Sequence, residues 1–377
     1  MSVRRFSADA VPGAQRGMSL VEVMVAMAIG IILLLGLGIL FVNSTRVFKV
    51  SDEFARMQEN GAYALNAMGA DLRMVGFFGL ISSADLQVPV SFVVAGDCGT
   101  DWAIDFAQPL SALHDLDASQ ANTELNCIQV ANFIPSTTNR KSFILVLRGA
   151  TGTPVLPAEL TVGNAPGSLY VQADPGGGIL FKGDQYAGLA APFKRTTYPR
   201  PYVSGAPPVD APIYLYQARA YYLRPCSRPT GAGAACLASD DGNEPIPTLV
   251  RQELAGTAAG TTAMTEVAVA EGIEAIRVLY GVDTDDLAPI PDGVPNAYTE
   301  VPDDTQLARV VTARIAVLVR SPQPTNGYDD ASRRYDLDGD GIAELNCTAD
   351  ALPCNYHRHV FTQTFQLRNV AQRLASP

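Results

Sequence analysis

Hydrophobic and polar residues follow three successive patterns along the chain. Residues 23–42 contain no charge and no proline, and as a helix they would span about 30 Å, enough to cross a bilayer once. Beyond them, apolar residues recur three or four positions apart, which is typical of one buried stripe of a helix. The stripe comprises Phe54, Met57, Gly61, Leu65, Met68, Leu72 and Val75, and Gly76 and Gly79 are natural stops.

From residue 80 onward, short β-rich runs alternate with Gly, Pro, Asp and Asn. The predicted strands are 88–95, 127–134, 142–149, 168–173, 178–183, 212–224, 273–282, 309–321 and 359–369. The segment ADPGGG (173–178) reads as the turn of a β-hairpin. One amino-terminal helix followed by an antiparallel sheet, with long loops at 184–211 and 225–247, predicts an α+β fold.

Charge sets the orientation of the apolar run and excludes one class of partner. Arg4, Arg5 and Arg16 precede the run with Asp9 as the only acid there, so we expect the start to stay in the cytoplasm and the body to be exported. The whole chain has a net charge of −11 without any basic block. Nucleic acid is therefore not expected as a partner.

Six cysteines fall into three couples that are close in sequence. None has CxxC spacing, which disfavours a zinc or thioredoxin-like site and favours disulfides in an oxidising compartment. Six cysteines allow many pairings, of which we favour the local one. It joins Cys98 to Cys127, Cys226 to Cys236 and Cys347 to Cys354.

The segment GMSLVE (17–22), directly before the apolar run, resembles the class III signal of type IV prepilins and pseudopilins. The resemblance implies that a prepilin peptidase cuts between Gly17 and Met18 on the cytoplasmic side and methylates the new amino terminus. Met18 stands where Phe is common, and Val21 where Ile is common, both apolar replacements. The resemblance also implies that Glu22 offsets the positive amino terminus of a neighbouring subunit. The alternative is a plain signal anchor with an acid at its edge, which an interfacial position tolerates.

Four further segments narrow the resemblance to the PilW group of minor pilins, over nearly the whole chain. They are FARMQENGAYALNAMGADLRMVGFFG (54–79), VAEGIEAIRVLYGVDTD (268–284), ARIAVLVRS (313–321) and FTQTFQLRN (361–369). The implied architecture is a type IV pilin-like fold, with a long helix packed on an antiparallel sheet domain that has disulfide-braced loops. Its parts are a cleaved leader (1–17), a membrane and assembly helix (18–42), an amphipathic continuation (43–78) and a globular domain (79–377).

The PilW resemblance implies a minor pilin that primes pilus assembly. Its expected partners are other minor pilins, often a tip adhesin, the major pilin, the prepilin peptidase and the inner-membrane assembly platform. We expect a single-pass inner-membrane precursor with a periplasmic body, found at the pilus tip on the cell surface after assembly. Two alternatives stay open: a J-like pseudopilin of a type II secretion system, and a calcium-dependent adhesin on a pilin anchor.

The acidic segment YDLDGDGIAELNC (335–347) is a candidate calcium loop. Asp336, Asp338, Asp340 and a glycine have the spacing of an EF-hand-like loop, and Ile342 could offer its carbonyl. Glu344 takes the ninth position, whereas Cys347 stands at the twelfth, where a bidentate glutamate is expected. Calcium is thus the one candidate cofactor, and the alternative is an ion-free surface turn. The run 283–286 is similar but lacks the glycine, and we interpret it as a solvated turn.

The sequence gives no reason to expect an enzyme. It lacks GxSxG, HExxH and a phosphate-binding glycine loop. His357 and His359 would share one strand face and could bind a metal, although such pairs more often simply border a strand. We therefore predict no catalytic residues.

Overall fold

The computed structural model describes residues 17–79, 81, 85–137, 139–189, 194–197, 208–285 and 292–370. It divides into two compact units, Met1–Glu53 and Phe54–Pro377. The predicted leader lies outside the described residues except for Gly17. Each unit is treated separately below.

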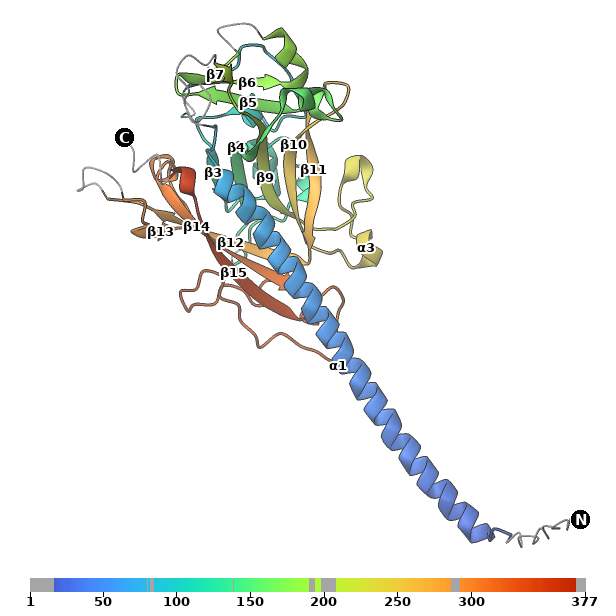
Figure 1. Cartoon of the computed structure of the whole chain (residues 1–377). Coiled ribbons are helices and arrows are strands. Elements are labelled where there is room, and N and C mark those ends of the chain that lie inside the picture. The colour runs from blue at the N-terminus through green and yellow to red at the C-terminus, as the bar shows by residue number, and fades with distance from the viewer. Residues whose placement is uncertain are drawn as a thin grey trace, which may run out of the picture. The chain divides into compact units, whose positions relative to one another are not determined.

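A single long helix, α1, runs from Leu20 to Met74 (Figure 1). Its first part belongs to the amino-terminal unit and is apolar, with none of its most hydrophobic stretch buried. Its second part belongs to the body, where Met57, Leu65, Met68 and Leu72 are buried as the stripe predicts. The helix ends as expected, because Gly76 adopts a positive φ of 69° that suits glycine.

The larger sheet of the body, here called sheet A, has nine strands among the described residues, in the order β1-β6-β5-β9-β10-β11-β2, and β4 pairs with both β3 and β9. Pairing is antiparallel except for β1 with β6 and β2 with β11. Its strands are β1 (Leu86–Gln87), β2 (Val94–Ala95), β3 (Leu110–His114), β4 (Phe143–Val155), β5 (Leu169–Asp174), β6 (Gly177–Lys182), β9 (Ile213–Arg224), β10 (Thr248–Gly256) and β11 (Thr262–Glu271).

The smaller sheet, sheet C, is antiparallel in the order β13-β12-β14-β15. It comprises β12 (Ile273–Val282), β13 (Ala297–Thr299), β14 (Val310–Arg320) and β15 (Arg358–Gln366). A long excursion, residues 321–357, leaves β14 and returns as β15. The remaining elements are short: the pair β7 (Thr196–Thr197) with β8 (Val209–Asp210), helices α2 (Ala118–Glu124), α3 (Asp240–Asn243) and α4 (Asp304–Leu307), and 3-10 turns at Trp102–Ile104, Val130–Asn132, Pro157–Thr161, Ala165–Gly167, Gly183–Gly188 and Ala232–Ala234.

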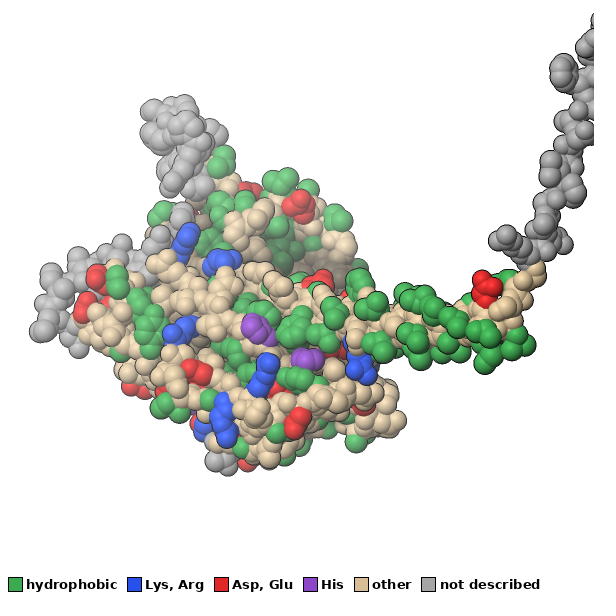
Figure 2. All heavy atoms as spheres, turned by 90° about the horizontal axis from the view of Figure 1, so that it is seen from below, with side chains coloured by type: hydrophobic (Ala, Val, Ile, Leu, Met, Phe, Trp, Pro, Cys, Tyr) green, Lys and Arg blue, Asp and Glu red, His purple; other side chains and the backbone are tan. Residues whose placement is uncertain are grey.

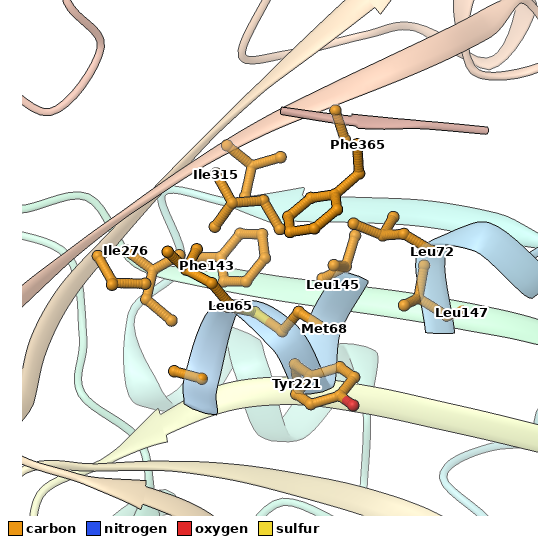
Figure 3. Close-up of a cluster of buried hydrophobic side chains, with 14 of the residues drawn as sticks. Leu65, Met68, Leu72, Phe143, Leu145, Leu147, Tyr221, Ile276, Ile315 and Phe365 are labelled. Carbon is orange, nitrogen blue, oxygen red and sulfur yellow. The ribbon is translucent and has the colours of Figure 1, made fainter. Parts of the chain in front are cut away.

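The main core lies where α1 meets both sheets. Leu65, Met68 and Leu72 of α1 pack between side chains of the two sheets (Figure 3). Sheet A contributes Phe143, Leu145, Leu147 and Tyr221, and sheet C contributes Ile276, Ile315 and Phe365. The α+β architecture predicted from the sequence is therefore the one observed.

Most predicted strands are present, but two are wrong. β4, β5, β6, β9, β12, β14 and β15 overlap their predicted runs, and β5 and β6 form the predicted hairpin, with Asp174 opposite Gly177. The run 88–95 contains Pro89, which lacks an N–H, and only Val94 and Ala95 of it pair. Within the run 127–134, residues Val130–Asn132 form a 3-10 turn instead of a strand. The Asn132 side chain donates to the Ala234 carbonyl and accepts the Cys236 N–H, which ties this turn to the loop 225–247.

Candidate functional site

The start of α1 contains the residues of the predicted processing and assembly signal. Gly17 and Met18 are exposed and precede the helix. Ser19 caps it, since its Oγ accepts the Glu22 N–H at 3.2 Å and its carbonyl accepts Glu22 N–H and Val23 N–H. The sequence S-x-x-E is that of a capping box, a signal that the sequence reasoning missed. Glu22 is exposed in the first turn, where the positive end of the helix dipole favours a carboxylate.

The helix beyond Glu22 presents hydrophobic side chains on all sides. Ile32, Leu34 and Phe41 expose 68%, 69% and 73% of their surface, and Figure 2 shows hydrophobic side chains covering this part of the helix. A helix that is apolar all round is stable only in lipid or among other apolar helices. Its composition and length therefore suit a membrane span and, equally, a bundle of similar helices.

Within the body, α1 is fixed to sheet C by close contacts. Gly61 lies beneath the Phe361 ring and Gly69 beneath the Phe365 ring, where a Cβ would come within 2.5 Å and 2.1 Å of ring carbons. The Asn369 side-chain amide donates to the carbonyls of Arg73 and Val75, at 3.0 and 3.2 Å. These donors satisfy carbonyls that the end of a helix leaves unpaired.

Sheet A holds the opposite side of α1 through polar contacts. Asp71 pairs with Arg219 and accepts the Tyr221 hydroxyl at 2.5 Å. Asn60 donates to the Glu271 carbonyl at 3.0 Å. Burial beside the Asp71 carboxylate raises the pKa of the Tyr221 hydroxyl, which therefore stays a neutral donor. The helix is thus held in one rotational setting between the two sheets.

The acidic loop brings together the four carboxylates that its spacing predicts. Asp336, Asp338, Asp340 and Glu344 each offer an oxygen within 4.8 Å of the others. Oxygens that share a calcium ion lie no farther apart than about 5 Å, twice the usual metal–oxygen distance. The residues therefore fit a calcium ion in type and spacing.

Hydrogen bonds from backbone N–H groups to the carboxylates define the turn of this loop without an ion. Asp336 accepts the N–H groups of Gly339 and Gly341 at 2.6 and 2.9 Å. Both glycines have positive φ, 76° and 87°, which the turn requires. Glu344 accepts the Leu337 N–H at 2.7 Å. Its pKa is raised, first by burial and then by the charge of Asp338.

Two arginines of sheet C, not foreseen from the sequence, contact the loop. Arg277 on β12 lies 3.5 Å from the Asp338 carboxylate and also pairs with Glu300. Arg314 on β14 donates to the Asp338 carbonyl. The Cys347 sulfur, at the position of the missing glutamate, is bonded to Cys354 and is no ligand. The other two disulfides, Cys98–Cys127 and Cys226–Cys236, also have the favoured local pairing.

A buried ionic network anchors the excursion that carries the loop. Arg358 on β15 is buried and binds Glu274 at 2.5 and 3.1 Å and Asp330 at 3.1 Å. Tyr335, the first residue of the loop segment, donates its hydroxyl to Asp330 at 2.8 Å. Because every member is hydrogen-bonded, the network fixes the excursion on sheet C.

The second acidic run and the histidine pair lie in surroundings that differ from those expected. Asp283, expected in a solvated turn, is fully buried and accepts the N–H groups of Asp285 and Gly293; it is a structural acid, and Asp286 lies outside the described residues. His357 is buried with its ring 3.7 Å from that of Tyr328, whereas His359 is exposed and contacts Phe361. The two imidazoles therefore have different surroundings, which does not favour a shared metal.

Comparison with protein families gives two matches. Residues 236–369 match the family described as Type IV Pilus-assembly protein W, and residues 13–38 match the prokaryotic N-terminal methylation motif. The first match covers α3, β10, β11, all of sheet C and the acidic loop, whereas the second covers the start of α1. Both agree with the resemblance read from the sequence.

Comparison with individual proteins adds little. No curated protein matches the chain. Among solved structures, the type IV-like pilin TTHA1219 from Thermus thermophilus is similar over 41% of this chain and 79% of its own, at 12% identity and a TM-score of 0.17. The α+β fold of this chain is defined by its own helix and sheets.

Proposed function

We infer from a prepilin methylation motif and a PilW domain on one chain that this protein is a type IV pilus minor pilin of the PilW type. From that premise we propose that it joins other minor pilins, and a tip adhesin where one is present, to prime pilus assembly. The precursor spans the inner membrane once with its body in the periplasm. After cleavage between Gly17 and Met18 and methylation of Met18, it reaches the pilus tip at the cell surface. This is the work of a structural subunit, not of an enzyme.

The observation that carries this proposal is the start of α1. An exposed carboxylate stands there at the head of an apolar helix. A carboxylate at the centre of a bilayer costs about 2.5–3.5 kcal/mol on insertion scales, whereas one within about 4 Å of an ammonium group in a low dielectric is strongly attracted to it. In the proposed mechanism, Glu22 pairs with the Met18 amino group of a neighbouring subunit, and this couples exit from lipid to entry into the filament.

The capping role of this segment must be separated from docking, because Glu22 is also the third residue of the capped turn. Glu22→Gln keeps a side chain that can complete a capping box but removes the charge. We expect it, like Glu22→Leu, to insert into the membrane and to be cleaved normally, yet to be depleted several-fold from sheared pili. The control Ser19→Ala loses the cap, worth about 1 kcal/mol, and keeps the charge, so its incorporation should stay close to normal.

Normal incorporation of both Glu22 variants would contradict the docking role and leave Glu22 as an edge residue of a signal anchor. A deletion strain tests the function as a whole. Loss of surface pili and of twitching is the expected result. Intact pili with lost secretion of exoproteins would instead indicate a J-like pseudopilin of a type II secretion system.

We also propose that the acidic loop binds calcium through Asp336, Asp338, Asp340 and Glu344, with the Ile342 carbonyl as a further ligand. The support is the convergence of four carboxylates on a loop already shaped by its glycines. A bound calcium ion would supply positive charge that offsets their mutual repulsion. The loop residues themselves hold the turn and orient the oxygens.

Calcium binding is tested by thermal unfolding of the purified chain with chelator and with millimolar calcium. Calcium should raise the melting temperature of the wild type, and Asp338→Ala should abolish the increase. Asp329→Ala is a matched control, because Asp329 is an exposed acid of the same excursion outside the cluster. No shift in the wild type would refute the calcium site. A calcium-dependent adhesin is the favoured alternative if surface binding, and not piliation, is lost with Asp338→Ala.

A further inference from the structure

The chain contains two asparagine–glycine pairs, and they lie in opposite surroundings. Asn60–Gly61 belongs to α1, whereas Asn326–Gly327 belongs to the excursion between β14 and β15. In such a pair the backbone nitrogen of the glycine can attack the side-chain carbonyl carbon of the asparagine, because glycine has no Cβ to hinder the approach. Whether the attack occurs depends on how the fold holds the two residues.

The first pair is held within the helix. Gly61 lies beneath the Phe361 ring, and a residue inside an α-helix directs its N–H to the carbonyl four residues earlier. The Asn60 side-chain amide donates to the Glu271 carbonyl at 3.0 Å. Both reacting groups are therefore engaged in hydrogen bonds, and the fold protects this pair.

The second pair occupies the two central positions of an exposed turn. The Tyr328 N–H donates to the Thr325 carbonyl at 3.1 Å, which closes the turn around Asn326 and Gly327, both exposed. Gly327 has a positive φ of 78°, a value that glycine adopts readily. A Cβ added to it would meet no atom within 4 Å. Open space therefore surrounds the nitrogen that would attack.

The two reacting groups of this turn have no hydrogen-bond partner among the described residues. Neither the Asn326 side chain nor the Gly327 N–H is bonded to any part of the chain that the structure describes. The base of the turn is nevertheless fixed, because the Thr325 N–H donates to the Asn355 carbonyl at 2.7 Å. The fold thus presents this pair to solvent and leaves the asparagine side chain unrestrained.

We propose that Asn326 is a site of spontaneous deamidation in the folded chain, whereas Asn60 is not. The Gly327 nitrogen forms a bond to the Asn326 side-chain carbonyl carbon and gives up its proton, and the side-chain nitrogen leaves as ammonia. Water then adds to either carbonyl group of the resulting succinimide and breaks the bond of that carbonyl to the ring nitrogen. The products are aspartate and isoaspartate. The net reaction consumes water, releases ammonia and involves no oxidation or reduction.

The isoaspartate product changes the turn itself. Its side-chain carbon becomes part of the main chain, so the turn is one carbon longer and the bond from Tyr328 N–H to Thr325 can no longer form in the same geometry. The Tyr328 ring lies 3.7 Å from the His357 ring, and its hydroxyl donates to Asp330 at 2.8 Å. Because Asp330 belongs to the buried ionic network, the reaction should loosen the excursion that carries the acidic loop. This effect does not depend on the function proposed above.

Peptide mapping of the full-length chain, purified in detergent, tests the proposal. The tryptic peptides 57–73 and 321–333 each contain one of the two pairs. After incubation of the folded chain at mildly alkaline pH, we expect conversion to aspartate and isoaspartate in peptide 321–333 and several-fold less conversion in peptide 57–73. No conversion at Asn326, or equal conversion at Asn326 and Asn60, would overturn the proposal.

Incubation of the same chain in denaturant is the matched control. Unfolding removes both the helix and the turn, so the two peptides should then react at similar rates, since each has asparagine directly before glycine. If peptide 57–73 stayed unreactive in denaturant, its protection would come from its sequence and not from the fold, and the structural account would be wrong.

Limited proteolysis tests the effect on the excursion. The chain after conversion should be cleaved within residues 321–357 several-fold faster than the fresh chain, because cleavage requires local opening. Asn326→Asp has the new charge but a backbone of normal length, so its cleavage should stay near the wild-type rate. Equal cleavage of the converted and the fresh chain would refute the effect. Rapid cleavage of Asn326→Asp would overturn its assignment to the longer backbone.

Discussion

Two glycines of α1 lie in direct contact with phenylalanine rings of β15. At Gly61 and Gly69, an added Cβ would meet ring carbons of Phe361 and Phe365 far inside contact distance. Glycine normally weakens a helix by about 1 kcal/mol relative to alanine. Here the absence of a side chain is what allows the helix to lie directly on the strand.

Gly69→Leu should therefore destabilise the body despite the better helix propensity of leucine. Overpacking of this kind costs about 1–3 kcal/mol, and the melting temperature of the purified chain measures it. Ala70→Leu is the matched control, because Ala70 is exposed on the next position of the helix and surface changes stay within about 0.5 kcal/mol. Equal melting temperatures for the two variants would refute close packing at Gly69.

Glu344 gives the acidic loop a dependence on pH. Its pKa is raised by burial and by the charge of Asp338, so the Glu344 carboxyl group holds its proton more tightly in the folded chain than in the unfolded chain. Without calcium, the contribution of Glu344 is most favourable below the ordinary glutamate pKa and declines as the pH rises through the raised value.

Glu344→Gln should accordingly raise the melting temperature at neutral pH in chelator, and reduce the increase that calcium produces. Glutamine still offers an oxygen to the Leu337 N–H but brings no charge. Melting curves at pH 4 and pH 7.5, with and without calcium, measure both effects. A variant less stable than the wild type in chelator at pH 7.5 would contradict this account of Glu344.

At the scale of elements, the excursion 321–357 depends on one buried arginine. Arg358→Met would leave Glu274 and Asp330 buried with less compensation, since the remaining arginines are more distant: Arg320 lies 3.6 Å from Glu274 and the exposed Arg333 lies 3.8 Å from Asp330. Breaking a buried ion pair in this way costs about 3–5 kcal/mol. We expect a lower melting temperature and new protease cleavage within the excursion.

Arg333→Ala provides the comparison for Arg358→Met. Arg333 lies 3.8 Å from the same Asp330, but its side chain is 58% exposed, so its loss should cost less than about 1 kcal/mol. If both variants behave alike, the excursion is held by its hydrophobic contacts instead of the ionic network.

The accuracy of the sequence-based strand predictions follows local composition. β12, β14 and β15 are long runs rich in β-branched and aromatic residues between clear breakers, and their predicted bounds agree with the structure to within three residues. β10 and β11 were missed, because alanine and glutamate weaken the strand pattern and their pairing with each other and with β9 decides the outcome.

The same contrast holds for the candidate sites: residues close together in the sequence were predicted, whereas residues that come from distant strands were not. The acids of the loop are close together in the sequence, so their spacing predicted the cluster. The prepilin signal is also one continuous segment, and its resemblance to a known motif identified it. Arg277, Arg314 and Arg358 come from other strands, and no local pattern links them to the acids they contact. The capping role of Ser19 was visible as S-x-x-E and was overlooked.

For the whole molecule, the division between Glu53 and Phe54 predicts how the chain can be separated. The strongly exposed apolar residues of α1 are concentrated between Leu20 and Phe48, whereas the body has its own core. A fragment comprising residues 54–377 should therefore be soluble, monomeric and oxidised when secreted to the periplasm. Size-exclusion chromatography, circular dichroism and a thiol assay measure these properties. Aggregation or free thiols in a fragment that is exported would contradict an independent body.

The parallel course of α1 and β15 has a mechanical consequence. The Phe361 and Phe365 rings lie directly against Gly61 and Gly69, so the helix cannot slide along the strand without first moving away from it. A pull along the helix axis is therefore passed to β15 and loads its ladder with β14 lengthwise. In that direction the hydrogen bonds of a ladder share the force and must yield together, whereas a pull across the strand would open them one after another. We therefore expect the body to resist tension along this part of its helix.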